Sequence, residues 1–76
     1  MPRYFFNVID GFSTPDSDGV VLPDIEGAKT AAVILSGEIL RDLGAKFWRI
    51  PSWQMNVSDE SGAVILVLRL SAEDVR

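Results

Sequence analysis

The chain has 76 residues, a formal net charge of −4, and neither cysteine nor histidine. The missing residue types exclude disulfides, thiolate and imidazole metal sites, and catalytic pairs that depend on Cys or His. A chain of this length buries only about 60% of its unfolded surface, so we expect a partner chain to supplement its small core. The acidic balance argues against nucleic acid as the main partner, because phosphate binding needs clustered Lys and Arg.

Two strands are predicted before the helix. Residues 3–9, RYFFNVI, are rich in aromatic and β-branched side chains, which suit a packed sheet. A polar loop follows them. Residues 20–22 form a short second strand, which ends at Pro23 because proline cannot donate a hydrogen bond to a ladder.

The middle of the chain predicts one helix over residues 25–43. Asp24 is a favourable N-cap and Gly44 a favourable stop. Apolar side chains at helical spacing form one stripe that we expect to face the sheet. The stripe consists of Ile25, Ala28, Ala31, Ala32, Leu35, Ile39 and Leu43. Gly37 lies in mid-helix, where it is either tolerated or marks the close approach of a partner.

Two further strands are predicted after a connector that Pro51 interrupts. They span residues 53–58 and 63–70, and the turn DESG joins them. The last strand carries apolar side chains on both faces, which is typical of a central strand or of one that uses a face as an interface.

The expected fold is therefore α+β, a two-layer ββαββ arrangement with one helix on one face of a four-stranded sheet. We expect the spatial order second–first–fourth–third (2-1-4-3), in which the strands at 3–9 and 63–70 are central and parallel. The all-antiparallel order second–first–third–fourth (2-1-3-4) is the alternative. A single helix leaves one sheet face bare and apolar, which is unusual in a soluble monomer and predicts a homo-oligomer or another protein partner. The possible interface residues are Phe5, Ile9, Trp48, Trp53, Ile65 and Val67.

The stretch PDSDG resembles part of a calcium-binding loop, because two acidic residues alternate before a glycine. With Asp16, Asp18 and Gly19 at loop positions 3, 5 and 6, position 12 is Ile25, where a calcium loop needs Glu. We therefore interpret it as a turn, and we predict neither a metal nor a cofactor. A second acidic turn around Asp59 is expected to be solvated and to lie at the opposite end of the sheet.

The segment KFWRIPSW interleaves bases with aromatics. Lys46 and Arg49 are possible nucleic-acid contacts beside Trp48, as on a stacking platform for single strands. Trp and Arg are also enriched at protein interfaces, and we prefer that interpretation because the chain is acidic. No serine lies in a recognisable Ser-Lys motif, so we predict neither an enzyme nor a small-molecule substrate.

The hydropathy pattern predicts no membrane span, because no apolar run approaches the roughly 18 residues that one needs. The opening MPRYFFNVIDGF lacks a cationic stretch followed by a long apolar run, so we expect a cytoplasmic protein rather than a secreted one.

Three motifs, MPRYFFNVIDG, DSDGVVLPDIEGAKTAA and VSDESGAVILVLRL, together resemble a family of short uncharacterised proteins common in rhizobia and related alphaproteobacteria. The resemblance covers nearly the whole chain and implies no assigned activity. Members often carry His after YFF, where this chain has Asn7. A weaker likeness, at the level of fold, is to HicB-type antitoxin domains, in which a hairpin ends in a PD step and leads into an alanine-rich helix.

Two hypotheses follow from the sequence. The leading one is a non-enzymatic interaction module that self-associates through the uncovered apolar sheet face. The alternative is an antitoxin-like or nucleic-acid-associated regulator.

Overall fold

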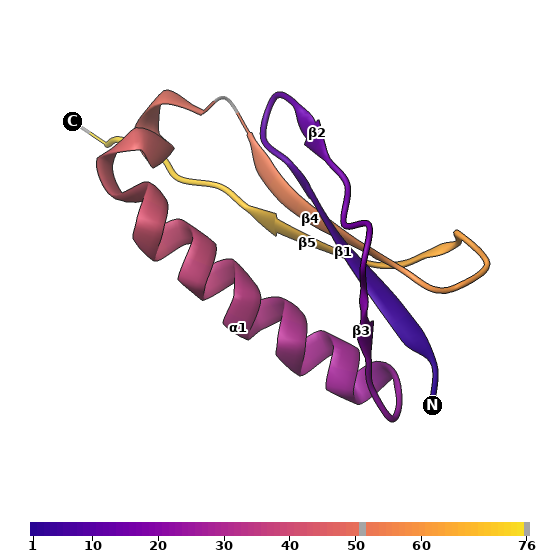
Figure 1. Ribbon diagram of the computed structural model, residues 1–76. Helices are drawn as coiled ribbons and strands as arrows, with labels where there is room; N and C mark the ends of the chain where they lie inside the picture. Colours follow the sequence, from indigo (N-terminus) through magenta and orange to yellow (C-terminus); the bar gives the residue numbers. More distant parts are fainter. Residues whose placement is uncertain (51, 76) are drawn as a thin grey trace.

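The computed structural model describes residues 1–50 and 52–75, so Pro51, which we expected to interrupt the connector, lies outside the described residues. The elements in chain order are β1 (Arg3–Ile9), β2 (Ser13–Thr14), β3 (Val20–Val21), α1 (Ile25–Leu43), the 3-10 helix η1 (Gly44–Arg49), β4 (Trp53–Ser58) and β5 (Val64–Leu70). Figure 1 shows α1 lying along one side of the strands. The α+β class with one helix on one sheet face is confirmed.

The sheet is antiparallel in the order β2-β1-β4-β5, and β3 pairs with the same edge of β1 as β2 does. The expected order 2-1-4-3, with residues 63–70 in the centre, is therefore wrong. The four expected strands follow the all-antiparallel alternative instead. The short turn after Ser58 returns the chain directly beside β4, which places β5 at the edge.

The second expected strand is shorter than predicted, and β2 was not predicted. Thr14 pairs with Val8 at one end of β1, and Val20 pairs with Tyr4 at the other. Between these pairings the chain bends out, and the backbone N–H of Phe6 donates to Oδ2 of Asp16 over 3.2 Å instead. A carboxylate thus replaces a strand along part of this edge.

The core lies between α1 and the helix-facing side of the sheet. Its buried residues are Tyr4, Phe6, Ala28, Ala32, Trp53, Met55 and Val57. The alanines have almost no exposed surface, and their small side chains let the helix sit close to the strands. The buried Ser36 on α1 donates its hydroxyl to Sδ of Met55 over 3.6 Å.

The helix boundaries follow the predicted capping residues. The carboxylate of Asp24 accepts from the backbone N–H of Gly27 over 2.8 Å. At the other end Gly44 adopts a positive φ of 52°, and its N–H donates to the carbonyl of Leu40. The expected irregular connector begins as the 3-10 helix η1.

Candidate functional site

The sheet face opposite α1 is more polar than the sequence predicted. Because side chains alternate along a strand, the face away from the core carries Asn7 beside Asn56 and Ile9 beside Gln54. Asn7 donates from Nδ2 to the carbonyl of Asn56 over 3.2 Å, and Gln54 donates from Nε2 to Oδ1 of Asn56 over 2.9 Å. The side-chain amide of Asn7 thus bonds the backbone of Asn56, and the side-chain amides of Gln54 and Asn56 bond each other, so polar contacts occupy the middle of the face.

Of the six predicted interface residues, three lie on the open face, two pack in or against the core, and one is exposed on η1. Phe5, Ile9 and Val67 lie on this open face, with Phe5 and Ile9 half-buried. Ile65 is also half-buried and packs against the core, next to the register shift between β4 and β5.

The two tryptophans differ in exposure: one lies at the surface and the other in the core. Trp48 is 66% exposed on η1, where its ring meets Phe47 edge to face at 5.9 Å. Trp53 is only 2% exposed and is a core residue beneath α1, so it offers no surface for an interface. The sequence could not separate the two, because both lie in one aromatic segment.

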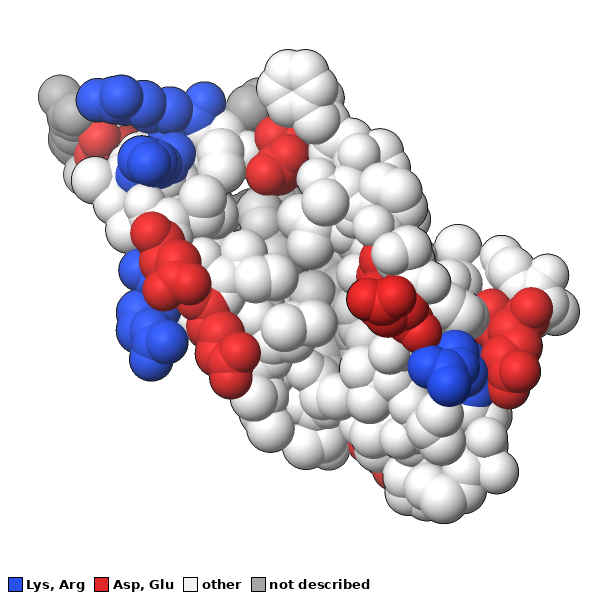
Figure 2. Space-filling model, viewed as in Figure 1, with Lys and Arg blue, Asp and Glu red and all other residues white. Residues whose placement is uncertain are grey.

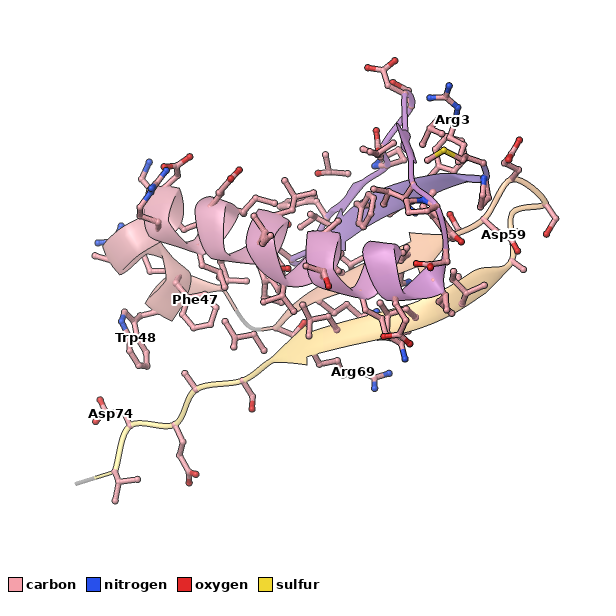
Figure 3. All side chains as sticks on the ribbon, turned by 90° about the horizontal axis from the view of Figure 1, so that it is seen from below. Arg3, Phe47, Trp48, Asp59, Arg69 and Asp74 are labelled. Carbon is pink, nitrogen blue, oxygen red and sulfur yellow. The ribbon has the colours of Figure 1, made fainter. Side chains whose placement is uncertain are left out.

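The outer edge of β5 is the most apolar free edge of the sheet. Among the described residues no strand pairs with this edge. Val64, Val67 and Leu70 are 54%, 37% and 40% exposed, respectively, and Arg69 supplies the strand's one charge. Figure 3 looks onto α1 with β5 as the free lower edge, from which Arg69 points outward.

A groove of about 260 Å³ separates α1 from β5. Val33, Gly37 and Leu40 form its helix side, and Leu68 and Leu70 lie on the strand side. Val33 is 62% exposed, and nothing lies within 4 Å of the place a Cβ would take on Gly37. The apolar edge of β5 therefore continues into an apolar groove.

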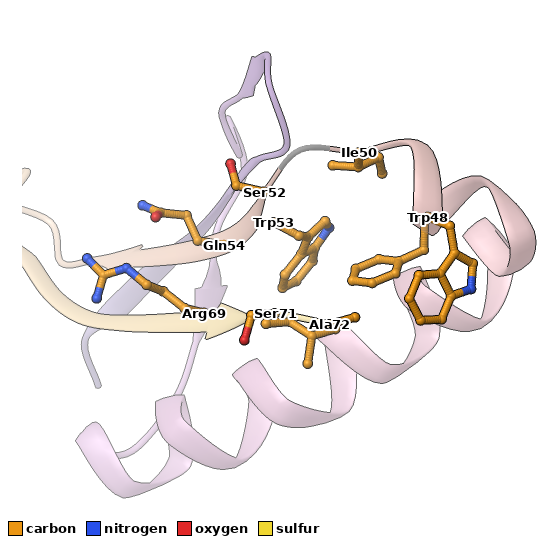
Figure 4. Close-up of a pocket in the computed structure, with 10 residues that line it drawn as sticks. Trp48, Ile50, Ser52, Trp53, Gln54, Arg69, Ser71 and Ala72 are labelled. Atoms are coloured by element: carbon orange, nitrogen blue, oxygen red, sulfur yellow. The ribbon is translucent and has the colours of Figure 1, made fainter. Parts of the chain in front are cut away.

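A second hollow of about 340 Å³ adjoins the groove at the η1 end, and Figure 4 shows the residues that line it. The two hollows share Trp53, Arg69 and Leu70. Nε1 of Trp53 is buried and has no hydrogen-bond partner in the described part of the chain. Sequence reasoning missed both hollows; the alternation of Leu66, Leu68 and Leu70 was visible, but not the position of β5 at an edge.

The predicted basic contacts lie on η1. Lys46 and Arg49 are exposed there, one on each side of Trp48. Figure 2 shows blue side chains at the end of the molecule where α1 ends, with red side chains close by, and a further blue group between red ones toward the other end. Trp48 and the two cations are thus all exposed on η1, and their role as nucleic-acid contacts stays a prediction.

The two acidic loops lie at the same end of the sheet, not at opposite ends as expected. Arg3 links them, because its backbone N–H donates to Oε1 of Glu60 over 3.0 Å and its Nη1 to the carbonyl of Asp18 over 2.8 Å. The expectation failed because it kept residues 10–19 in a loop beyond the end of β1, whereas β2 turns back beside Val8 and residues 15–19 run along the edge of β1 toward Arg3. Among the described residues no group of three or more acidic side chains is placed to hold a metal ion.

The carboxylates of both loops accept hydrogen bonds from the backbone. Partial burial raises the pKa of Asp16, but hydrogen bonds from the backbone N–H groups of Gly19, Phe6 and Asp18 outweigh it and hold the pKa below 3.8. A hydrogen bond from the Ser61 hydroxyl is the main cause of the lowered pKa of Asp59. Both carboxylates thus accept the hydrogen bonds that shape their turns.

No helix in the described ranges is both long enough and apolar enough to cross a membrane. The comparison with curated proteins and the comparison with solved structures each found no match. A family model described as "Domain of unknown function (DUF6894)" matches residues 3–71. The chain therefore belongs to this family, and the resemblance to a family of uncharacterised proteins is confirmed.

Proposed function

We propose that this member of a family of unknown function is a non-enzymatic protein-interaction module, which self-associates through the part of its sheet that α1 leaves uncovered. The accessible surface carries the proposal. It measures 5364 Å² for a chain of 8.4 kDa. A folded monomer of that mass exposes roughly 4,600 Å². The excess is close to the roughly 800 Å² that each partner buries in a standard interface.

The shape and the exposed side chains support the same proposal. The radius of gyration is 13.1 Å, against roughly 11 Å for a compact domain of this length. Part of the extra surface belongs to the extended tail after β5. The rest includes exposed apolar side chains on β5 and on the adjoining side of α1. The sequence expectation of a bacterial cytoplasmic protein stays part of this proposal.

Mass measurement over a range of concentrations tests the proposal. Light scattering on a size-exclusion peak should give a mass of at least twice 8.4 kDa at high concentration. The apparent mass should fall toward the monomer on dilution. A monomer that stays soluble and monodisperse at high concentration would contradict self-association.

A second candidate function is an antitoxin-like or nucleic-acid-associated regulator. The exposed Trp48 between Lys46 and Arg49 favours it, because a ring flanked by cations can stack on a base while the cations contact phosphates. Binding to single-stranded DNA or RNA at low salt should then weaken in Arg49→Ala, with a smaller salt dependence. No binding at low salt by the wild-type chain would end this candidate.

A further inference from the structure

We infer that β5 pairs edge to edge with β5 of a second copy, antiparallel and centred on Leu68, so that the two sheets form one continuous sheet. This deepens the proposed self-association and rests on it. It names a surface different from the open face that the sequence indicated, and it fixes which side chains meet.

The two edges of the sheet differ in how open they are to another strand. At one edge the short strands β2 and β3 and the carboxylate of Asp16 occupy hydrogen-bonding groups of β1. The other edge is β5, seven residues long with a single charge and no proline. Natural edge strands are usually protected by short length, by Lys or Pro, or by a covering element. An edge strand as long and apolar as β5 is a template for strand addition.

The groove beside this edge fits the leucines of a second copy. On β5, Leu66, Leu68 and Leu70 share the face that points toward α1. In a pair centred on Leu68, Leu66 lies opposite Leu70 of the second copy, and Leu68 lies opposite its own equivalent. The leucines of each strand then border the groove of the other, and the side of α1 that carries Val33 and Gly37 faces the second helix.

The centre of the pairing follows from the regular part of the strand. The register between β4 and β5 shifts at Val57 and Ser58, so regular pairing runs from Leu66 to Leu70. Leu68 is the middle of that stretch. This register also sets Arg69 opposite Val67 of the second copy and avoids two arginines facing each other, which would be unfavourable.

A second copy is the occupant that the surface favours. A two-fold axis requires a self-complementary patch, and the Leu66, Leu68, Leu70 row meets that requirement when it is reversed about its centre. The part of the excess accessible surface that lies on β5 and the adjoining side of α1, rather than on the tail, is apolar surface of the kind that one partner of a dimer buries.

The main experiment compares two substitutions of Val67 that introduce opposite charges. In the inferred register, Val67→Lys sets a cation opposite Arg69 of the second copy, twice per dimer, whereas Val67→Glu sets an anion there. The dimer dissociation constant of the Lys variant should exceed that of the Glu variant by roughly ten- to a hundredfold at low salt, and the difference should shrink at high salt. Sedimentation equilibrium measures both constants, and circular dichroism checks that both variants fold.

Matched controls use the opposite edge. Val20 is 46% exposed on β3, so Val20→Lys and Val20→Glu should both dimerise as the wild type does. Cysteine cross-linking adds a measurement that does not depend on charge, because the chain has no cysteine of its own. Leu68→Cys should give a disulfide-linked dimer under mild oxidation, and Val20→Cys should not.

The outcomes separate this inference from the proposed function. A wild-type chain that stays monomeric contradicts both. A wild-type dimer whose dissociation constant does not distinguish Val67→Lys from Val67→Glu, and which Leu68→Cys does not cross-link, overturns the β5 pairing and leaves self-association standing. In that case Ile9→Lys on the open face should abolish the dimer.

Discussion

The backbone N–H of Phe6 donates a hydrogen bond to Oδ2 of Asp16 over 3.2 Å, at a point on the edge of β1 between its pairings with β2 and β3. The other carboxylate oxygen of Asp16 accepts from the N–H groups of Asp18 and Gly19, each at 3.1 Å. The N–H of Asp16 itself donates to Oδ1 of Asn7 over 2.9 Å. One carboxylate therefore shapes the loop and holds it against β1. The acidic residue that resembles a calcium ligand in the sequence is thus a hydrogen-bond acceptor for the backbone.

The carboxylate of Asp16 should stabilise the fold, and the side-chain amide of asparagine at this position should not replace it. Asp16→Asn would turn an NH₂ donor toward one of the N–H donors that the carboxylate accepts. We expect a loss of about 1–2 kcal/mol in the free energy of unfolding, measured by urea denaturation. Asp18→Asn is the matched control, because the side chain of Asp18 makes no hydrogen bond within the described part of the chain, and it should cost less than about 0.5 kcal/mol. Equal effects of the two variants would contradict the role of Asp16.

The lowered pKa of Asp16 predicts that the free energy of unfolding decreases as the pH falls. Its folded-state pKa lies below the unfolded value of 3.8. Its contribution is therefore complete above pH 3.8 and is lost as the pH falls through the folded pKa. Wild-type stability should decline over this range, more steeply than that of Asp16→Asn. Parallel urea midpoints for the two proteins between about pH 2 and pH 5 would contradict it. Asp59 titrates in the same direction in both proteins, so it does not affect the comparison.

The boundaries of most elements could be predicted from the sequence because local chemistry sets them. Asp24 and Gly44 bracket α1 as expected, since a cap and a left-handed stop act within one turn of the helix. The strands over 3–9 and 53–58 have the predicted limits. The strand β2 was missed because it consists of two polar residues, Ser13 and Thr14, with no alternating pattern.

The strand order and the interaction surface could not be predicted, because both depend on contacts between distant segments. The expected order placed residues 53–58 at an edge, yet β4 is central, where Gln54 donates to the side chain of Asn56 and Asn7 donates to its backbone carbonyl. The two-sided apolar pattern of β5 suggested a central strand, yet β5 lies at an edge. The same error hid the groove beside α1, which exists only because β5 has no neighbour on its outer side among the described residues.

The indole of Trp53 tests how the core tolerates a buried N–H group without a hydrogen-bond partner. Trp53→Phe loses some packed ring surface but also removes an N–H that has no partner in the described part of the structure. These effects oppose each other, so we expect the free energy of unfolding to change by less than about 1 kcal/mol. Trp53→Ala should cost about 3–5 kcal/mol, because it leaves a large cavity. A phenylalanine variant nearly as destabilised as the alanine variant would show that the N–H has a partner, such as a bound water.

Two glycines should respond to alanine in opposite directions. A Cβ on Gly19 would lie 2.9 Å from the carbonyl oxygen of Tyr4 and from side-chain atoms of Arg3 and Phe5. Gly19 also has a φ of +71°, which alanine rarely adopts. Gly19→Ala should therefore cost about 2–4 kcal/mol of unfolding free energy.

Gly37 lies in the middle of α1 with open space around the position of its Cβ. Alanine there removes backbone entropy from the unfolded chain, so Gly37→Ala should raise the unfolding free energy by about 0.5–1 kcal/mol. Urea denaturation of both variants at low protein concentration measures folding apart from association. If Gly37→Ala stabilises the monomer but weakens the dimer, the methyl group obstructs a helix that approaches along this side of α1. A stabilised monomer with unchanged dimerisation would place the second helix elsewhere.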